Sequence, residues 1–261
     1  MTRVWYQVLS SRAKTPEMFG VLQEHLDSLA NQGTTVDIQG TAVGGFADQY
    51  SAFLHLDGAR ILDLALENFS GDSPPDVYAM ANSLDPVVQG LREVLDVPVL
   101  TLMEVACSLA PSLGDRYGIL VPNRKFYPMY RDLVASYGSA SKLGAIDNLP
   151  YDRILDMRGI FAGDAGAADK CMSAVSDGFS RLGDRGADIV IVPGPVGMFL
   201  SHSGVTEFDG VRYLDAFGLL LKVAEGIAAM PGLTTSRFWR YAKPPQALFE
   251  EALSEYDLPR Q

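Results

Sequence analysis

The sequence predicts an α/β fold in which parallel sheets carry helices on both faces. Segments with strand propensity alternate with segments of helical periodicity along the chain, as in proteins with parallel sheets. Ala187–Val192 is largely apolar, which is typical of a parallel strand buried on both faces. Residues 76–88 and 188–199 form a weak internal repeat, each a strand followed by a polar turn. A two-fold duplicated architecture and a single continuous one therefore both remain open.

The first half of the chain contains four expected strand–helix pairs. Phe19, Leu22 and Leu26 recur at helical spacing, and an Asp-Pro pair suits the start of a helix. The expected elements are a strand at Val4–Val8, a helix at Pro16–Leu29, a strand at Thr34–Ile38, a helix at Leu54–Phe69, a strand at Asp76–Ala81, a helix opened by Asp85-Pro86, a strand at Val97–Leu102 and a helix at Glu104–Leu113.

The second half repeats this alternation. Its expected elements are a strand at Arg116–Val121, a helix at Pro128–Tyr137, a strand at Lys142–Ile146, a helix at Ala165–Leu182, a strand at Ala187–Val192, a strand at Val211–Tyr213 and a helix at Leu214–Met230. Open parallel sheets bind ligands at the carboxyl ends of their strands. We therefore expect a site after Val8, Met80, Leu102, Val121 and Val192.

Composition excludes several classes of function. The net charge of -11 disfavours nucleic-acid binding, and no apolar run is long enough to predict a membrane span. Cys107 and Cys171 form no CxxC pair, and the three histidines lie far apart in sequence. We therefore expect no disulfide scaffold, no metal and no cofactor, in a cytoplasmic protein.

Four stretches together resemble a known family. They are Asp85-Pro86 with Leu91-Arg92-Glu93 and Val97-Pro98-Val99, Leu113-Gly114-Asp115-Arg116-Tyr117-Gly118-Ile119, Gly186-Ala187-Asp188 with Gly194-Pro195-Val196-Gly197-Met198, and Gly210-Val211-Arg212-Tyr213-Leu214-Asp215 with Leu221-Lys222-Val223-Ala224-Glu225. In order and spacing these stretches resemble the aspartate/glutamate/hydantoin racemase superfamily, and its hydantoin-racemase branch in particular.

The resemblance implies two similar α/β lobes that face each other across a cleft. We expect residues 1–110 and 215–230 to form one lobe, residues 111–214 the other, and residues 231–261 a C-terminal extension. That extension is amphipathic and aromatic, so it either packs on its own domain or reaches a neighbouring subunit of a homo-oligomer. The resemblance also implies one catalytic cysteine at a strand end of each lobe, the pair removing and returning a proton on a carbon acid. A single-cysteine branch performs decarboxylation instead.

This sequence departs from the family at both thiols. Asn82 stands where the motif has its first cysteine, and Pro195, or Gly194 if the alignment slips by one residue, stands at the second. Neither side chain transfers a proton. Cys107 and Cys171 match neither position, and we predict chemistry that is independent of cysteine.

Other residues are candidates for the site. Asn82 offers an amide at a strand end, His202 carries an imidazole suited to general acid–base work, and Glu104 begins a helix after a strand; these three are the candidate catalytic residues. The candidate substrate-binding residues are Gln7, Ser10, Ser83, Asn123 and Pro195. The alternatives are a surface-loop histidine at His202, a plain helix-entry turn at residues 82–83, and a solvated basic loop at residues 123–125.

The leading hypothesis is a racemase-like isomerase that acts on a small carboxylate or a cyclic imide or amide. The reaction passes through an enolate-like or oxyanion intermediate that donors in the cleft stabilise. A ring-opening hydrolase, or a lyase such as a decarboxylase, is the first alternative, since both thiols are missing. A binding protein that has lost the chemistry is the second.

Overall fold

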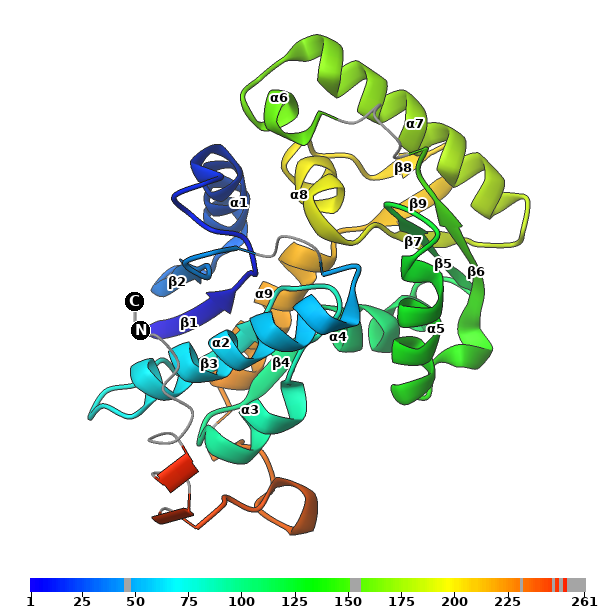
Figure 1. The fold of residues 1–261 in the computed structure, drawn as a ribbon. Helices are drawn as coiled ribbons and strands as arrows, with labels where there is room; N and C mark the ends of the chain where they lie inside the picture. Colours follow the sequence, from blue (N-terminus) through cyan, green and yellow to red (C-terminus); the bar gives the residue numbers. More distant parts are fainter. Residues whose placement is uncertain (45–47, 151–155, 231, 246, 249–250, 253–261) are drawn as a thin grey trace.

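Two parallel sheets form the framework of the computed structural model, which describes all residues except 45–47, 151–155, 231, 246, 249–250 and 253–261 (Figure 1). The first sheet has the strand order β2-β1-β3-β4, with bounds Thr34–Gln39, Thr2–Gln7, Val77–Met80 and Val99–Thr101. The second has the order β6-β5-β7-β9-β8, with bounds Leu143–Asn148, Tyr117–Val121, Ile189–Ile191, Val211–Leu214 and Glu207–Phe208. The edge strand β8 is antiparallel to β9, and the other pairings are parallel.

Helices follow nearly every strand. Their bounds are Pro16–Leu29 (α1), Ser51–Phe69 (α2), Val88–Val94 (α3), Leu102–Leu109 (α4), Phe126–Ser136 (α5), Met157–Phe161 (α6), Ala165–Gly183 (α7), Gly194–His202 (α8) and Ala216–Ala228 (α9), with short 3-10 turns at Ala110–Ser112, Ala140–Lys142 and Trp239–Tyr241. Within the described residues, none of these helices is both long and apolar enough to span a membrane.

The two sheets share one topology. The order β2-β1-β3-β4 of the first sheet corresponds to β6-β5-β7-β9 of the second, so β3 and β7 hold equivalent inner positions. These strands belong to the two repeated segments of the sequence. The duplicated α/β architecture is therefore confirmed, and β8 is an addition at one edge.

Three clusters of buried side chains hold the layers together. The largest lies between the lobes and joins β1 to β5 through residues such as Tyr6 and Ile119. A second packs α7 on the outer face of the second sheet, and a third packs α2 and α3 on the outer face of the first. Helix α9 follows a strand of the second sheet but contacts β1, β3 and α4, and it lies at the centre of the molecule (Figure 1). The lobe boundaries at residues 110 and 214 stay predictions.

The segment around Asp85 differs from expectation. The helix expected to open at Asp85-Pro86 begins at Val88, and Asp85 and Val87 adopt left-handed φ angles of 46° and 49°. Helix α4 begins at Leu102, two residues before the expected start. The reason is that the Asp85 carboxylate accepts hydrogen bonds from the backbone N–H groups of Met103 and Glu104. Asp85 therefore caps α4 rather than the helix that follows it.

Several motif residues have structural roles. Asp188 accepts hydrogen bonds from the N–H groups of Asp115 and Arg116 at 2.8 and 3.2 Å, and so connects two of the family-like motifs. A Cβ atom on Gly114 would lie 2.8 Å from the Cβ of Asp188, and one on Gly197 would lie 1.9 Å from the carbonyl oxygen of Val192. A side chain at Gly114 would push the segment before β5 away from Asp188, and one at Gly197 would push α8 away from the chain that follows β7.

The described part of the C-terminal extension packs on α3. Arg237 donates hydrogen bonds to the carbonyl oxygens of Arg92, Glu93 and Leu95 and pairs with Asp96. Phe238 and Trp239 remain 69% and 83% exposed.

Candidate functional site

A cavity of about 290 Å³ lies where the carboxyl ends of both sheets meet. Four strand ends contribute to its wall, namely those of β1, β3, β5 and β7. The lining residues are Val8, Leu9, Ser10, Asp48, Gln49, Ala81, Asn82, Ser83, Pro122, Asn123, Phe126, Tyr130, Pro193, Gly194, Pro195 and Met198. This is the place that the topology of open parallel sheets predicts for a ligand.

The structure brings five of the eight candidate residues together. Ser10, Asn82, Ser83, Asn123 and Pro195 all line the cavity. Each follows a strand directly or within a few residues, so the common sheet edge collects them.

The other three candidates do not line it. Gln7 is fully buried, where its amide bonds to the indole of Trp5 and to backbone carbonyls. Glu104 forms an ion pair with Arg92 of α3. His202 is the last residue of α8, about 12 Å along the helix from Gly194 at a rise of about 1.5 Å per residue, and its ring lies 3.8 Å from Glu24 of α1. The geometry therefore does not support His202 or Glu104 as groups that reach the substrate.

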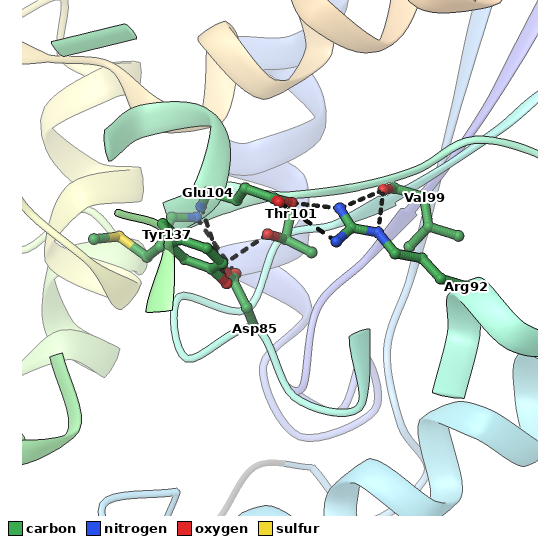
Figure 2. A network of polar contacts seen from close by, with 7 residues as sticks. Asp85, Arg92, Val99, Thr101, Glu104 and Tyr137 are labelled. Carbon is green, nitrogen blue, oxygen red and sulfur yellow. Dashed lines mark hydrogen bonds and ion pairs between the residues drawn. The ribbon is translucent and has the colours of Figure 1, made fainter. Parts of the chain in front are cut away.

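A polar network centred on Asp85 anchors the loop that follows β3 (Figure 2). The same loop carries Asn82 and Ser83. The Asp85 carboxylate accepts hydrogen bonds from the hydroxyls of Thr101 at 2.8 Å and Tyr137 at 2.7 Å. Since Tyr137 follows α5, the network also joins the two lobes. Burial raises the pKa of Asp85 to about 6, although each of these hydrogen bonds lowers it. Beside it, Arg92 bonds to the carbonyl of Val99 and to Glu104, so the arginine of the family-like motif joins α3 to α4.

Sequence reasoning missed three polar side chains of the wall. Asp48, Gln49 and Tyr130 line the cavity. Asp48 and Gln49 come between β2 and α2, and β2 ends at the same sheet edge as β1 and β3. They lie nine and ten residues beyond the end of β2 at Gln39, so the strand-end pattern that selected Ser10 and Asn82 does not mark them. Tyr130 lies within α5 and carries no such signal.

Hydrogen bonds orient the polar side chains of the wall. The Oδ1 atom of Asn82 accepts from the N–H of Leu84 at 2.9 Å, and the Asn82 amide lowers the pKa of the neighbouring Asp48 carboxyl, which burial raises. The Tyr130 hydroxyl donates to the Oγ of Ser83 at 2.8 Å, which leaves the Ser83 proton available to a ligand.

Contacts between the lobes close one side of the cavity. The amide of Asn123 donates to the Oε1 atom of Gln49 at 3.0 Å, and the ammonium of Lys125 lies 4.6 Å from the centre of the Tyr50 ring. Lys125 and Arg124 are exposed and do not line the cavity. Both cations therefore lie outside the described wall of the cavity.

Both cysteines lie outside the cavity. Cys107 is buried in α4 and Cys171 in α7. Burial raises the pKa of Cys107 to about 12 and that of Cys171 to about 11. In the described part of the chain, no group of three His, Cys, Asp or Glu side chains is arranged to hold a metal ion.

Fold and cavity together define a two-lobed α/β protein with a small-molecule site between its sheets. A sequence model of the Asp/Glu/hydantoin racemase family matches residues 46–215, and the chain belongs to this family. It is 24% identical over 181 residues to a hydantoin racemase of Paenarthrobacter aurescens, covering 69% of this chain and 73% of that protein. It is 26% identical over 181 residues to a hydantoin racemase of Pseudomonas sp. (strain NS671), covering 69% of each.

Solved structures agree on the fold. The allantoin racemase of Pseudomonas fluorescens superposes with a TM-score of 0.75 at 18% identity, covering 94% of this chain and 97% of that one. The allantoin racemase of Klebsiella pneumoniae gives 0.72 at 18% identity, covering 94% and 95%. The two-lobed racemase fold and the predicted superfamily are thus confirmed, and the homologues support an isomerase-type (racemase) enzyme.

Proposed function

We propose that the chain is a racemase-type isomerase that acts on a small uncharged cyclic amide or imide. It removes and returns a proton on the carbon next to a carbonyl group, without using a thiol. The observation that carries this proposal is the chemistry of the cavity wall. Its polar side chains are amides and hydroxyls with one carboxyl group, and no lysine, arginine or histidine is among the described lining residues.

This wall favours a neutral substrate over a carboxylate. An amino-acid or dicarboxylate substrate needs a cationic or strongly donating partner, because an unpaired charge in a buried site is costly. Asp48 adds a like charge when it is ionised. A cyclic amide instead offers carbonyl oxygens and N–H groups, which match the amides of Asn82 and Asn123 and the hydroxyls of Ser10 and Ser83.

The start of α8 supports the charge that develops during the reaction. Gly194 and Pro195 line the cavity at the first turn of this helix. The partial positive charge of a helix N-terminus favours a negative oxygen nearby, so an enolate oxygen held at this wall is stabilised in the transition state.

Racemisation assays test the proposal. The purified protein is incubated separately with each enantiomer of several 5-substituted hydantoins and of allantoin, and with aspartate and glutamate for comparison. Chiral chromatography should show inversion of at least one cyclic amide and of neither amino acid. Inversion of the amino acids alone, or of nothing in the panel, would contradict the proposal.

We further propose that the enzyme is a homo-oligomer, which the exposed aromatic pair Phe238 and Trp239 supports. The cytoplasmic location expected from the cysteine content stays a prediction.

A further inference from the structure

Two side chains of the described cavity wall carry an ionisable group, Asp48 and Tyr130. The Tyr130 hydroxyl is fully buried and donates its hydrogen to Ser83, and burial raises its pKa well above the ordinary value. Tyr130 therefore keeps its proton at neutral pH. Asp48 is the wall residue that is able to take up and release one.

The side-chain amide of Asn82 has a fixed orientation and lies beside the Asp48 carboxyl group. Its oxygen is occupied by the N–H of Leu84, so the amide nitrogen is the atom that remains to donate to Asp48. The N–H of Gln49 also donates to this carboxylate. Asp48 and Asn82 follow different strands, β2 and β3, and both side chains line the same cavity.

Burial adjusts the basicity of this carboxyl group. It raises the pKa of Asp48, while the hydrogen bonds from Asn82 and from the backbone lower it, and the net direction is upward. The ionisable neighbours whose charge interacts with Asp48 are Asp57 of α2 and Tyr130 of α5. A carboxyl with a raised pKa is a stronger base towards a carbon acid, and its protonated form persists closer to neutral pH.

We infer that Asp48 is the proton-transfer residue of this site, held in place by Asn82. The inference rests on the proposed function, because the substrate is the same cyclic amide. In the forward step the C–H bond next to the carbonyl breaks, and its proton forms an O–H bond with the Asp48 carboxylate. The electron pair of the C–H bond moves into the carbonyl to give an enolate. In the return step the O–H bond of Asp48 breaks, its proton forms a C–H bond with the enolate carbon, and the carbonyl is restored. Inversion results when the planar enolate turns its opposite face to Asp48 before it takes up the proton.

Exchange of the substrate's carbon-bound proton for deuterium measures this step directly. Wild type, Asp48→Asn, Asp48→Glu and the control Asp72→Asn are incubated in D2O with a cyclic amide that the wild type accepts, and exchange is followed by proton NMR. Asp72 is an exposed aspartate outside the cavity. Asp48→Asn should exchange roughly 10²–10⁴-fold more slowly, the usual contribution of one general acid–base group. Asp48→Glu should restore part of the rate, and Asp72→Asn should match the wild type.

A second measurement needs no substrate. Carbon-13 NMR of the protein labelled at its aspartate carboxyls gives the titration of Asp48, assigned by the signal lost in Asp48→Asn. The midpoint should lie above those of exposed aspartates, and Asn82→Ala should raise it further because an amide donor is removed. An ordinary midpoint that Asn82→Ala leaves unchanged overturns the proposed contact.

The outcomes separate the two proposals. Exchange by the wild type that Asp48→Asn leaves intact overturns the role of Asp48, and the proposed function stands. No exchange by the wild type on any cyclic amide overturns the proposed function, and the role of Asp48 with it. Thermal unfolding of each variant shows whether a lost rate reflects a lost fold.

Discussion

Burial decides which single residues are available for chemistry. Both thiols of the chain are fully buried in helices, and burial holds the pKa of each several units above neutral. The thiolate is the reactive form of cysteine, so neither residue supplies one near pH 7. Asp48 is also largely withdrawn from water, but it lines a cavity. A buried group contributes to catalysis only where a substrate reaches it.

The double variant Cys107→Ala/Cys171→Ala tests this difference. Its activity on the accepted cyclic amide should stay within about three-fold of the wild type, since neither thiol lines the site and no proton-transfer group is lost. Iodoacetamide should inactivate neither protein. Rapid alkylation that stops activity and that substrate prevents would contradict a thiol-free mechanism.

Residue-level prediction succeeded where the local chain settles the position of a side chain. Ser10, Asn82, Ser83 and Asn123 follow strands, and parallel strands bring their carboxyl ends to one edge. Gln7 is the last residue of β1, and its neighbours Trp5 and Gln39 occupy its amide. The sequence predicts a polar turn after the strand in residues 188–199, but the structure has helix α8 there. The length of this helix separates His202 from the cavity. Asp48 lies nine residues beyond the end of β2, so no local pattern marks it.

At the scale of elements, one carboxylate sets the start of a helix and the position of a loop. Asp85 caps α4 through two backbone N–H groups and bonds to Thr101 and Tyr137. The Asp-Pro pair predicts the start of the next helix, because a capping side chain usually bonds within its own turn. The two N–H groups that Asp85 caps lie 18 and 19 residues further along the chain. A local sequence pattern does not encode a cap at that distance.

The stability of this network should depend on pH. The pKa of Asp85 is about 6 in the folded protein, above the unfolded value of about 3.9, so folding favours the protonated form. The stability contribution is therefore fully present below about pH 4 and is lost as pH rises through about 6. Over that range the unfolding free energy of the wild type should fall by about 3 kcal/mol relative to Asp85→Asn.

Urea unfolding of both proteins at pH 4 and pH 7 measures this change. Comparison between the two proteins removes the effects of the other ionisable groups, which they share. If the difference in unfolding free energy between wild type and Asp85→Asn stays constant with pH, the hydrogen bonds offset the effect of burial on the Asp85 pKa. If this difference grows towards pH 7, the hydrogen bonds outweigh burial. Either result would contradict the prediction.

At the scale of the whole molecule, the C-terminal extension presents an unpaired aromatic surface. Arg237 fixes the extension to α3, while the rings of Phe238 and Trp239 meet edge to face at 5.2 Å and remain exposed. Exposed aromatic pairs of this kind are typical anchors of subunit interfaces.

The variant Phe238→Ser/Trp239→Ser should therefore sediment as a smaller particle than the wild type. It leaves the Arg237 contacts intact, which truncation after Pro231 would not. Leu113→Ser is the control, since Leu113 is half exposed but lies on the second lobe. A wild type that already sediments as a monomer, or a double variant of unchanged size, would reject this interface.

The sheet topology was predictable because the alternation of strands and helices and the internal repeat are visible in the sequence. The unequal chemistry of the two lobes was only partly predictable. Asn82 follows β3, and Gly194 and Pro195 follow the equivalent strand β7. The first lobe places a carboxyl and an amide at this edge. The described lining residues of the second lobe include one ionisable side chain, Tyr130, whose proton is engaged by Ser83. A pseudo-symmetric fold thus encloses a site whose proton-transfer group lies on one side.

This asymmetry predicts unequal behaviour of the two substrate enantiomers in D2O. The enantiomer whose C–H bond faces Asp48 should lose its proton readily and recover a deuteron from the same carboxyl, so exchange should exceed inversion. The mirror-image enantiomer presents its C–H bond to Gly194 and Pro195, which have no side chain able to accept it, and should exchange more slowly. Initial rates of deuteration by NMR and of inversion by chiral chromatography are measured separately from each pure enantiomer. They give, for each enantiomer, the ratio of the deuteration rate to the inversion rate.

A ratio near one from both enantiomers would mean that each wall carries its own proton-transfer group. That result would contradict a site with Asp48 on one side alone.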